Sequence, residues 1–145
     1  MTSEEIATEM LKIDEGCMLL PYTCTAGALS IGYGRNLSDN GISQAEALIL
    51  LKHDVGTATR DAKKFLSKEC WEQLTAEHQA VVVNLAFNLG INRLRTFVKF
   101  RACLLAGDTV GAADELLDSR YAQQVGARAD RLASVLRGQN PLSTS

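Results

Sequence analysis

The sequence has no long run of apolar residues. Its uninterrupted apolar stretches, such as residues 47–51 and 80–83, are far shorter than the ~18–20 residues that a membrane-spanning helix needs. Residues 1–5 include neither a basic segment nor an apolar one, so no secretory signal is predicted. We therefore expect no membrane insertion, and we expect synthesis and retention in a cytoplasm.

Metal and cofactor signatures are also missing. No two cysteines have C-x-x-C spacing, and neither histidine lies at ligand spacing from a cysteine. The segment Gly32-Tyr33-Gly34 lacks the third glycine and the strand-to-helix context of a phosphate-binding loop. No metal and no cofactor are expected. A reducing compartment favours free thiols at all four cysteines, which are Cys17, Cys24, Cys70 and Cys103.

An excess of positive charge is absent as well. The 145 residues include 15 basic and 17 acidic ones, which argues against a nucleic-acid-binding protein held mainly by phosphate contacts. The charge is uneven, because residues 1–72 carry 7 basic and 11 acidic residues whereas residues 73–145 carry 8 and 6. The length predicts one domain, and the opposite signs of the two halves suit two lobes with a cleft.

Most of the sequence has helical patterning. Capping residues indicate helix starts at Thr2, Ser43 and Thr75, and glycines indicate helix ends at Gly16 and Gly90. The helix between Thr75 and Gly90 is the most apolar and the expected central one. Shorter helices are expected over residues 97–106, 110–117 and 128–137, before a frayed tail over residues 139–145.

Residues 17–41 differ, because glycines and β-forming residues are concentrated there. Between residues 28 and 34, the large apolar residues Leu29, Ile31 and Tyr33 alternate with small ones. A period of two predicts that these three face a core and that the small residues face away. Residues 25–27 are predicted to form a hairpin turn before this strand. The fold class is therefore α+β and mainly helical, with a small antiparallel sheet lobe and a larger helical lobe.

Glu15 is the first candidate for chemistry. It ends the first predicted helix directly before the sheet, so we expect it where the two lobes meet. The negative end of the helix dipole and partial burial in a cleft both favour the protonated acid. Protonation of a leaving-group oxygen requires such an acid. The alternative is a solvated glutamate without a catalytic role.

Three further residues are candidates. Ser30 lies on the small-residue side of its strand, where a flat polymer can approach the backbone and the hydroxyl can hold a water or a sugar. Cys24, in the loop before that strand, is either a buried filler or a thiol exposed to the same cleft. Arg128 is at the start of a short predicted helix, and Arg131 follows one turn later. The two arginines either bind an acidic ligand or lie on a solvated helix face.

These residues resemble the active-site lobe of phage-type lysozymes, glycoside hydrolase family 24. The specific part of the likeness is a spacing. In this pattern a Glu is followed, after eight intervening residues, by an Asp or Cys, and after five more by a Thr. The resembling segments are Ile13-Asp14-Glu15-Gly16, Pro21-Tyr22, Cys24-Thr25-Ala26-Gly27, residues 30–37, residues 84–90, Ser119-Arg120-Tyr121 and Arg128-Ala129-Asp130-Arg131.

The resemblance implies one lysozyme-like domain over residues 1–145, with a long helix joining the two lobes. Residues of about 14–58 are the sheet lobe and the connecting helix, and residues 1–13 and 59–138 are the helical lobe. Glu15 is then the general acid. Cys24 stands where the family usually has Asp and helps to activate the attacking water, and Ser30 stands at the Thr position that orients this water.

The resemblance also implies supporting residues. Arg128 matches the arginine that pairs with the catalytic glutamate. Arg35 replaces a histidine, Asn88 replaces a glutamine that contacts substrate, and the cleft strand includes Gly32 and Gly34. We expect the Cys24 thiol to be mostly neutral at pH 7, since its ordinary pKa is ~8.5 and a nearby anionic glutamate raises it further.

The function implied is hydrolysis of the β-1,4 bond between N-acetylmuramic acid and N-acetylglucosamine in bacterial peptidoglycan. A monomeric phage or prophage endolysin is expected, which accumulates in the host cytoplasm, reaches the wall after a holin opens the membrane, and binds no nucleic acid. The basic half of the chain, residues 73–145, is expected to bind the anionic wall through Arg93, Arg95 or Arg131. Two alternatives remain: an impaired lysozyme-like protein that binds peptidoglycan without cutting it, and a thiol-dependent enzyme with Cys24 as nucleophile.

Overall fold

The computed structural model describes residues 1–142, and the last three residues of the expected frayed tail lie outside the described part. The chain divides into two compact units, Met1–Leu50 and Leu51–Ser145, which we call the N-terminal and C-terminal units. The membership of residues 1–13 in the helical lobe stays a prediction.

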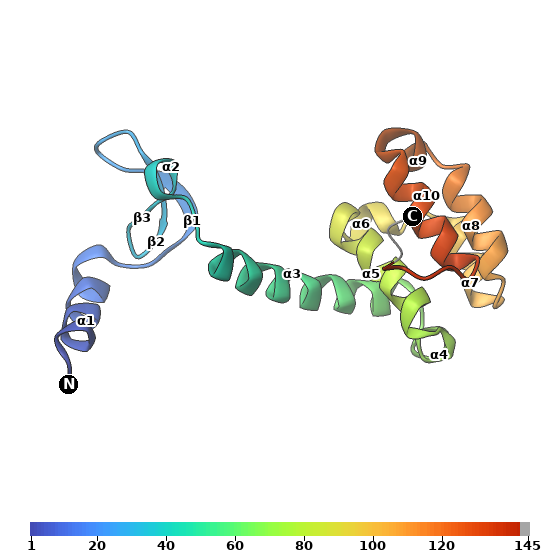
Figure 1. Ribbon diagram of the computed structural model, residues 1–145, viewed down its shortest axis with the longest axis horizontal. Coiled ribbons are helices and arrows are strands. Elements are labelled where there is room, and N and C mark those ends of the chain that lie inside the picture. Colours follow the sequence, from blue (N-terminus) through green and yellow to red (C-terminus); the bar gives the residue numbers. More distant parts are fainter. Residues whose placement is uncertain (143–145) are drawn as a thin grey trace. The chain divides into compact units, whose positions relative to one another are not determined.

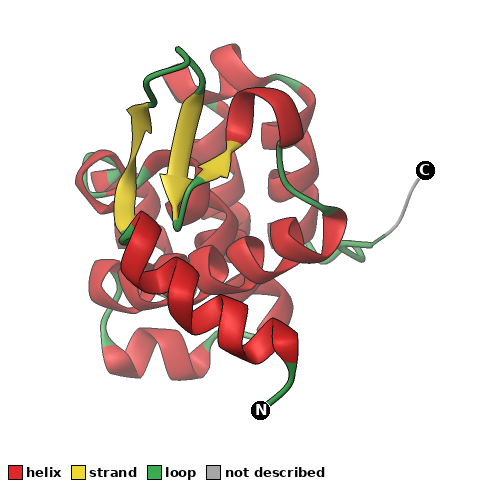
Figure 2. Ribbon diagram, turned by 90° about the vertical axis from the view of Figure 1, so that its left-hand side faces the viewer, coloured by secondary structure: helices red, strands yellow, loops and turns green. Residues whose placement is uncertain are grey.

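The N-terminal unit begins with helix α1 (Ser3–Glu15). Its predicted capping box is confirmed: the Glu5 amide donates to the Thr2 hydroxyl, and the Thr2 amide donates to the Glu5 carboxylate. Gly16, with φ of +65°, ends the helix, as expected. The chain then enters a three-stranded antiparallel sheet made of β1 (Met18–Thr23), β2 (Leu29–Gly32) and β3 (Arg35–Asn36), followed by α2 (Leu37–Asn40) (Figures 1 and 2).

The predicted hairpin turn over residues 25–27 joins β1 to β2, and the Cys24 amide donates to the Ala28 carbonyl at 2.8 Å. The expected facing of β2 is wrong. Leu29 and Tyr33 are 44% and 52% exposed, whereas Ser30 is 4% exposed. The physical reason is that no apolar residue between positions 1 and 50 is buried, so the sheet has no apolar core within its own unit.

Helix α3 (Gln44–Phe65) begins in the N-terminal unit and continues into the C-terminal unit. Its predicted start is confirmed, because Ser43 and Glu46 form a second capping box. The first half of α3 is exposed, and its buried residues, Ala58, Ala62 and Phe65, all lie in the second half.

The C-terminal unit is a helical bundle that includes α5 (Ala76–Leu89), the helix predicted to be central, which Thr75 caps and Gly90 ends. Helix α8 packs against α7 and α10, and α10 also packs against α5. Fully buried side chains such as Leu85, Leu94 and Phe100 form the core. The other helices are α4 (Lys68–Gln73), α6 (Ile91–Leu94), α7 (Val98–Leu105), α8 (Thr109–Leu117), α9 (Arg120–Val125) and α10 (Ala127–Leu136) (Figure 1).

The short helices α2, α6 and α9 were not expected from the sequence. Helix α9 has a local signal, because the Ser119 hydroxyl accepts a hydrogen bond from the Ala122 amide at its start. Across residues 1–142 no helix combines the length and the apolar character that crossing a membrane requires.

Candidate active site

Glu15 is the last residue of α1, and its carboxyl group lies against the turn that joins β2 to β3. A Cβ atom added to Gly34 in this turn would lie 3.0 Å from Oε2 and 3.1 Å from Cδ of Glu15. Gly34 also has φ of +76°, a conformation that favours glycine. The end of α1 and the β2–β3 turn therefore meet at the carboxyl group of the candidate acid.

The β1–β2 hairpin brings Cys24 and Ser30 together. Tyr22 pairs with Ser30 across the two strands, and Cys24 follows the end of β1. The Ser30 hydroxyl and the backbone amides of Ala26 and Ala28 lie near enough to the Cys24 sulfur to lower the pKa of its thiol. Two of the three candidate catalytic residues thus lie close together.

The electrostatic environment of Cys24 differs from the expectation. Hydrogen bonds from the Ala26 and Ala28 amides, supported by that of Ser30, lower the pKa of the Cys24 thiol, although desolvation opposes them. The expected upward shift is wrong because amide and hydroxyl donors around the sulfur stabilise the thiolate. The thiolate is therefore more populated near neutral pH than in an ordinary cysteine.

Gly32, the last residue of β2, has open space beside its Cα. It has φ of +68°, and a Cβ atom added there would meet nothing within 4 Å. This part of the strand leaves room for a ligand to approach the backbone.

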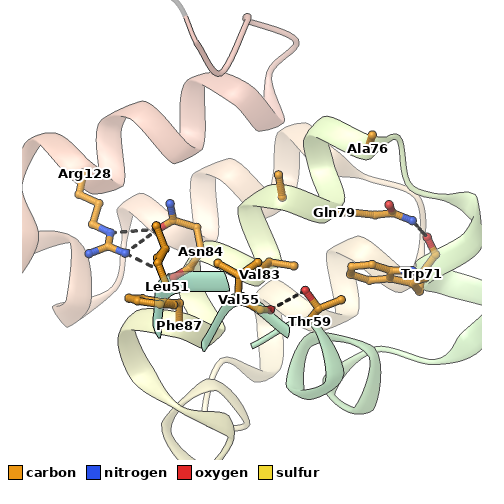
Figure 3. Close-up of a pocket in the computed structure, with 11 residues that line it drawn as sticks. Leu51, Val55, Thr59, Trp71, Ala76, Gln79, Val83, Asn84, Phe87 and Arg128 are labelled. Atoms are coloured by element: carbon orange, nitrogen blue, oxygen red, sulfur yellow. Dashed lines mark hydrogen bonds between the residues drawn. The ribbon is translucent and has the colours of Figure 1, made fainter. Parts of the chain in front are cut away.

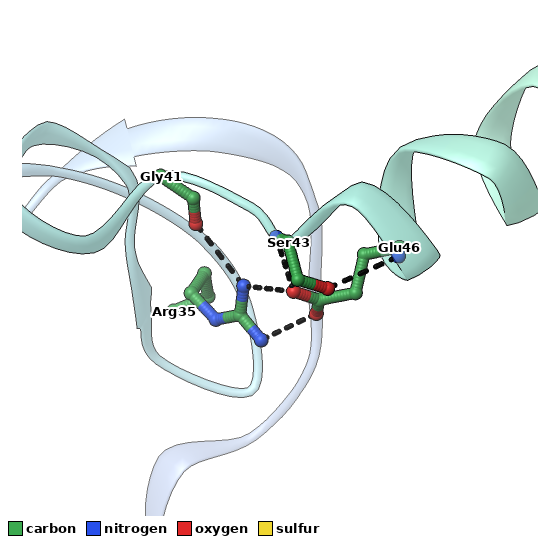
Figure 4. Close-up of polar contacts among 4 residues, drawn as sticks. All are labelled: Arg35, Gly41, Ser43 and Glu46. Atoms are coloured by element: carbon green, nitrogen blue, oxygen red, sulfur yellow. Dashed lines mark hydrogen bonds and ion pairs between the residues drawn. The ribbon is translucent and has the colours of Figure 1, made fainter.

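Arg35 in β3 is bound within the chain (Figure 4). Its guanidinium donates to both carboxylate oxygens of Glu46 and, at 3.1 Å, to the Gly41 carbonyl. The hydrogen bond from Arg35, together with donors from Ser43, lowers the pKa of Glu46 to about 2. The sequence identified Arg35 as a candidate but not its partner, because no pattern links positions 35 and 46.

Arg128 lies in the first turn of α10 and contacts α5. Its Nε and Nη2 groups donate to the Asn84 side-chain oxygen at 3.0 and 2.8 Å (Figure 3). Asn88 follows one turn later on α5 and is exposed. Asn84 had no assigned role, although it lies in one of the resembling segments.

Arg128 and Asn84 line a hollow of about 510 Å³ in the C-terminal unit (Figure 3). Most of its lining is apolar, and the remaining residues around it are Leu51, Val55, Thr59, Trp71, Ala76, Gln79, Ala80, Val83 and Phe87. The pairing of Arg128 with Glu15 stays a prediction.

Comparison with known proteins identifies the family. The profile of the phage lysozyme family matches residues 12–137. The chain belongs to the phage lysozyme family. The matched range includes every candidate site residue, from Glu15 to Arg128.

Two relatives support this membership. The chain is 29% identical over 123 residues to the endolysin of Acyrthosiphon pisum secondary endosymbiont phage 1, covering 82% of this chain and 80% of that protein. It is 27% identical over 154 residues to the pre-baseplate central spike protein Gp5 of Enterobacteria phage T4. That match covers 88% of this chain but only 27% of Gp5. The predicted lysozyme-type fold and glycoside hydrolase class are confirmed.

The phage lysozyme chain has four free cysteines, Cys17, Cys24, Cys70 and Cys103. Within residues 1–142, no group of three or more His, Cys, Asp and Glu residues is arranged to hold a metal ion. Buried Cys70 donates to the Leu104 carbonyl and packs in the core, so it is structural. Cys24 is the cysteine with a hydrogen-bonded environment suited to chemistry.

Proposed function

We propose that the chain is a muramidase that cuts the β-1,4 bond between N-acetylmuramic acid and N-acetylglucosamine in peptidoglycan during phage-directed lysis of the host. The closeness of Cys24 to Ser30 across the β1–β2 hairpin carries this proposal, because it occurs in the same unit as the Glu15 carboxyl group. Together they supply the acid and the water-activating groups that glycoside hydrolysis needs.

Glu15 acts as the general acid in this mechanism. It gives its proton to the glycosidic oxygen while the bond from that oxygen to the anomeric carbon breaks. The ring carbon gains positive charge, which the Glu15 carboxylate then stabilises. The missing side chain at Gly34 leaves room for the carboxyl group during this step.

Cys24 and Ser30 hold the attacking water. The Ser30 hydroxyl donates its hydrogen toward the Cys24 sulfur, so its oxygen lone pairs remain free to accept a hydrogen from water. The thiolate accepts the other water proton as the water oxygen bonds to the anomeric carbon. Attack on the face opposite the leaving group inverts the configuration at this carbon, as expected for the class.

Supporting roles follow for the remaining candidates. Gly32 gives the glycan access to the strand, Arg128 pairs with Glu15, and Asn88 contacts substrate. Arg35 supports the site through Glu46, because its guanidinium is already bound within the chain.

Lysis of outer-membrane-permeabilised bacteria tests the function. Wild type is expected to lyse them, Glu15→Gln to lose about 10²–10⁴-fold in rate, and Cys24→Ala to lose less, because it removes a base and leaves the acid. Wall binding without any lysis by wild type would instead favour the non-cutting binding protein. If Cys24→Ser is fully active after treatment with a thiol-blocking reagent, Cys24 is not a nucleophile.

A further inference from the structure

The C-terminal unit has a second hollow, distinct from the one at Arg128, at the end of α3. It measures about 440 Å³, and we call it the cationic hollow. Three of its lining residues are basic and none is acidic; the lining consists of Lys64, Phe65, Arg95, Val98, Arg101, Ala102 and Leu105.

The positive charge of the cationic hollow is not neutralised by the chain. No ion pair within residues 1–142 involves Lys64, Arg95 or Arg101. The surrounding sequence also lacks acid, since residues 78–107 include four basic residues and no Asp or Glu. Cations gathered around a concave surface raise the local concentration of anions.

Local structure accounts for only one of the three cations. Arg101 Nε donates to the Phe65 carbonyl at 2.6 Å, at the C-terminal end of α3, where a cation is favourable. The side chains of Lys64 and Arg95 make no hydrogen bond to any residue in the described part of the chain.

The hollow combines these cations with apolar surface. Phe65 is 3% exposed and stacks against Phe100, whereas Val98 is 70% exposed at the edge. Guanidinium groups bind phosphate through paired hydrogen bonds, and an apolar surface suits the non-polar face of a sugar ring. A sugar phosphate presents both features in a ligand of this size.

We propose that the cationic hollow binds a phosphate group carried on a sugar of the bacterial envelope. It would give the enzyme a contact with the envelope in addition to the glycan in its active site. The envelope as the source of the ligand rests on the proposed function, whereas binding of the sugar phosphate rests on the hollow alone.

Amide chemical shifts of the full-length ¹⁵N-labelled chain test the proposal with N-acetylglucosamine 6-phosphate as the probe. Shifts are expected at residues of the hollow, weaker ones with inorganic phosphate, and none there with N-acetylglucosamine. The double variant Lys64→Gln/Arg95→Gln is expected to bind the probe at least about tenfold more weakly. The matched control is Lys52→Gln/Arg60→Gln, which removes the same charge from α3 residues outside the hollow.

Equal weakening in the two double variants would overturn the proposal, because it would reflect net charge alone. The proposal would also be overturned if vesicles of anionic phospholipid changed the amide chemical shifts of the hollow residues and the sugar phosphate did not. The measurement needs no turnover. A chain that binds the probe but lyses no cells refutes the hydrolase, and a chain that lyses cells but does not bind the probe refutes the site.

Discussion

The carboxyl group of Glu15 lies where a side chain at Gly34 would begin. A methyl group at position 34 would come within 3.0 Å of Oε2, closer than nearly all real contacts of a Cβ atom. Since the nearest atoms belong to the end of a flexible side chain, a substitution there displaces the carboxyl group rather than the backbone. The absence of a side chain at position 34 therefore leaves room for the carboxyl group of Glu15.

Gly34→Ala is expected to lower kcat by at least about tenfold, because small displacements of a reacting group are costly. Gly32→Ala is the matched control. Both positions have φ near +70°, so both variants have a strain of about 1–2 kcal/mol, but only the methyl group at position 34 meets Glu15.

Steady-state rates on soluble peptidoglycan fragments, with thermal unfolding of both variants, separate the two effects. Equal losses of kcat in both variants would show that backbone strain, and not the contact with Glu15, limits the rate.

Cys24 is expected to react with iodoacetamide at lower pH than Cys103 does. Backbone amides lower the pKa of Cys24, whereas burial and then the nearby carboxylates of Asp108, Glu115 and Asp114 raise the pKa of Cys103. Because the thiolate is the reactive form, the midpoint of modification follows the pKa.

Both cysteines are half-buried, so access is comparable. Mass spectrometry of tryptic peptides, labelled at a series of pH values from roughly 6 to 9, gives both midpoints in one sample. Earlier labelling of Cys103 would contradict the hydrogen-bonded geometry around Cys24.

The ion pair between Arg35 and Glu46 makes an acid-dependent contribution to stability. The pKa of Glu46 falls from 4.5 to about 2 in the folded chain, so the folded state favours the charged form. The contribution is complete above pH 4.5 and is lost as the pH falls toward 2. Glu46→Gln is therefore expected to lower the free energy of unfolding at pH 7.

The difference between Glu46→Gln and wild type should shrink as the pH falls, in urea unfolding measured at several pH values. Glu72→Gln is the control, because Glu72 is exposed and makes no hydrogen bond or ion pair within residues 1–142. A difference that stays constant with pH would indicate lost packing instead of lost charge.

Lysis should weaken as salt concentration rises, because the C-terminal unit carries 13 basic and 10 acidic residues and the wall is anionic. Replacement of Arg93, Arg95 or Arg131 by Gln should reduce both the rate and its salt dependence. Turbidity assays between roughly 0.02 and 0.3 M salt measure this. A lysis rate that does not change with salt concentration would show that the charge of the C-terminal unit does not contribute to wall binding.

The sequence predicted the features that depend on neighbouring residues. Helix starts at Thr2, Ser43 and Thr75 were found because a capping side chain bonds to an amide only three positions away. The three candidate catalytic residues came from a motif within 16 positions, Glu15 to Ser30, that the family match now covers.

Features that depend on distant segments were missed. Ser30 is buried although its strand pattern predicted the reverse, because alternation shows two faces without showing which one is covered. The pKa of Cys24 was predicted from charge, whereas the direction of backbone amides decides it. The contacts of Arg35 with Glu46 and of Arg128 with Asn84 join positions that no local pattern connects.

The absence of any buried apolar residue between positions 1 and 50 has a consequence for protein engineering. This segment includes Glu15, Cys24 and Ser30, yet chains of this length rarely fold without a core of their own. The segment with the candidate catalytic residues is therefore expected not to fold when it is grafted alone onto a foreign wall-binding domain. A chimaeric lysin should carry at least the family-matched range, residues 12–137, as a single piece.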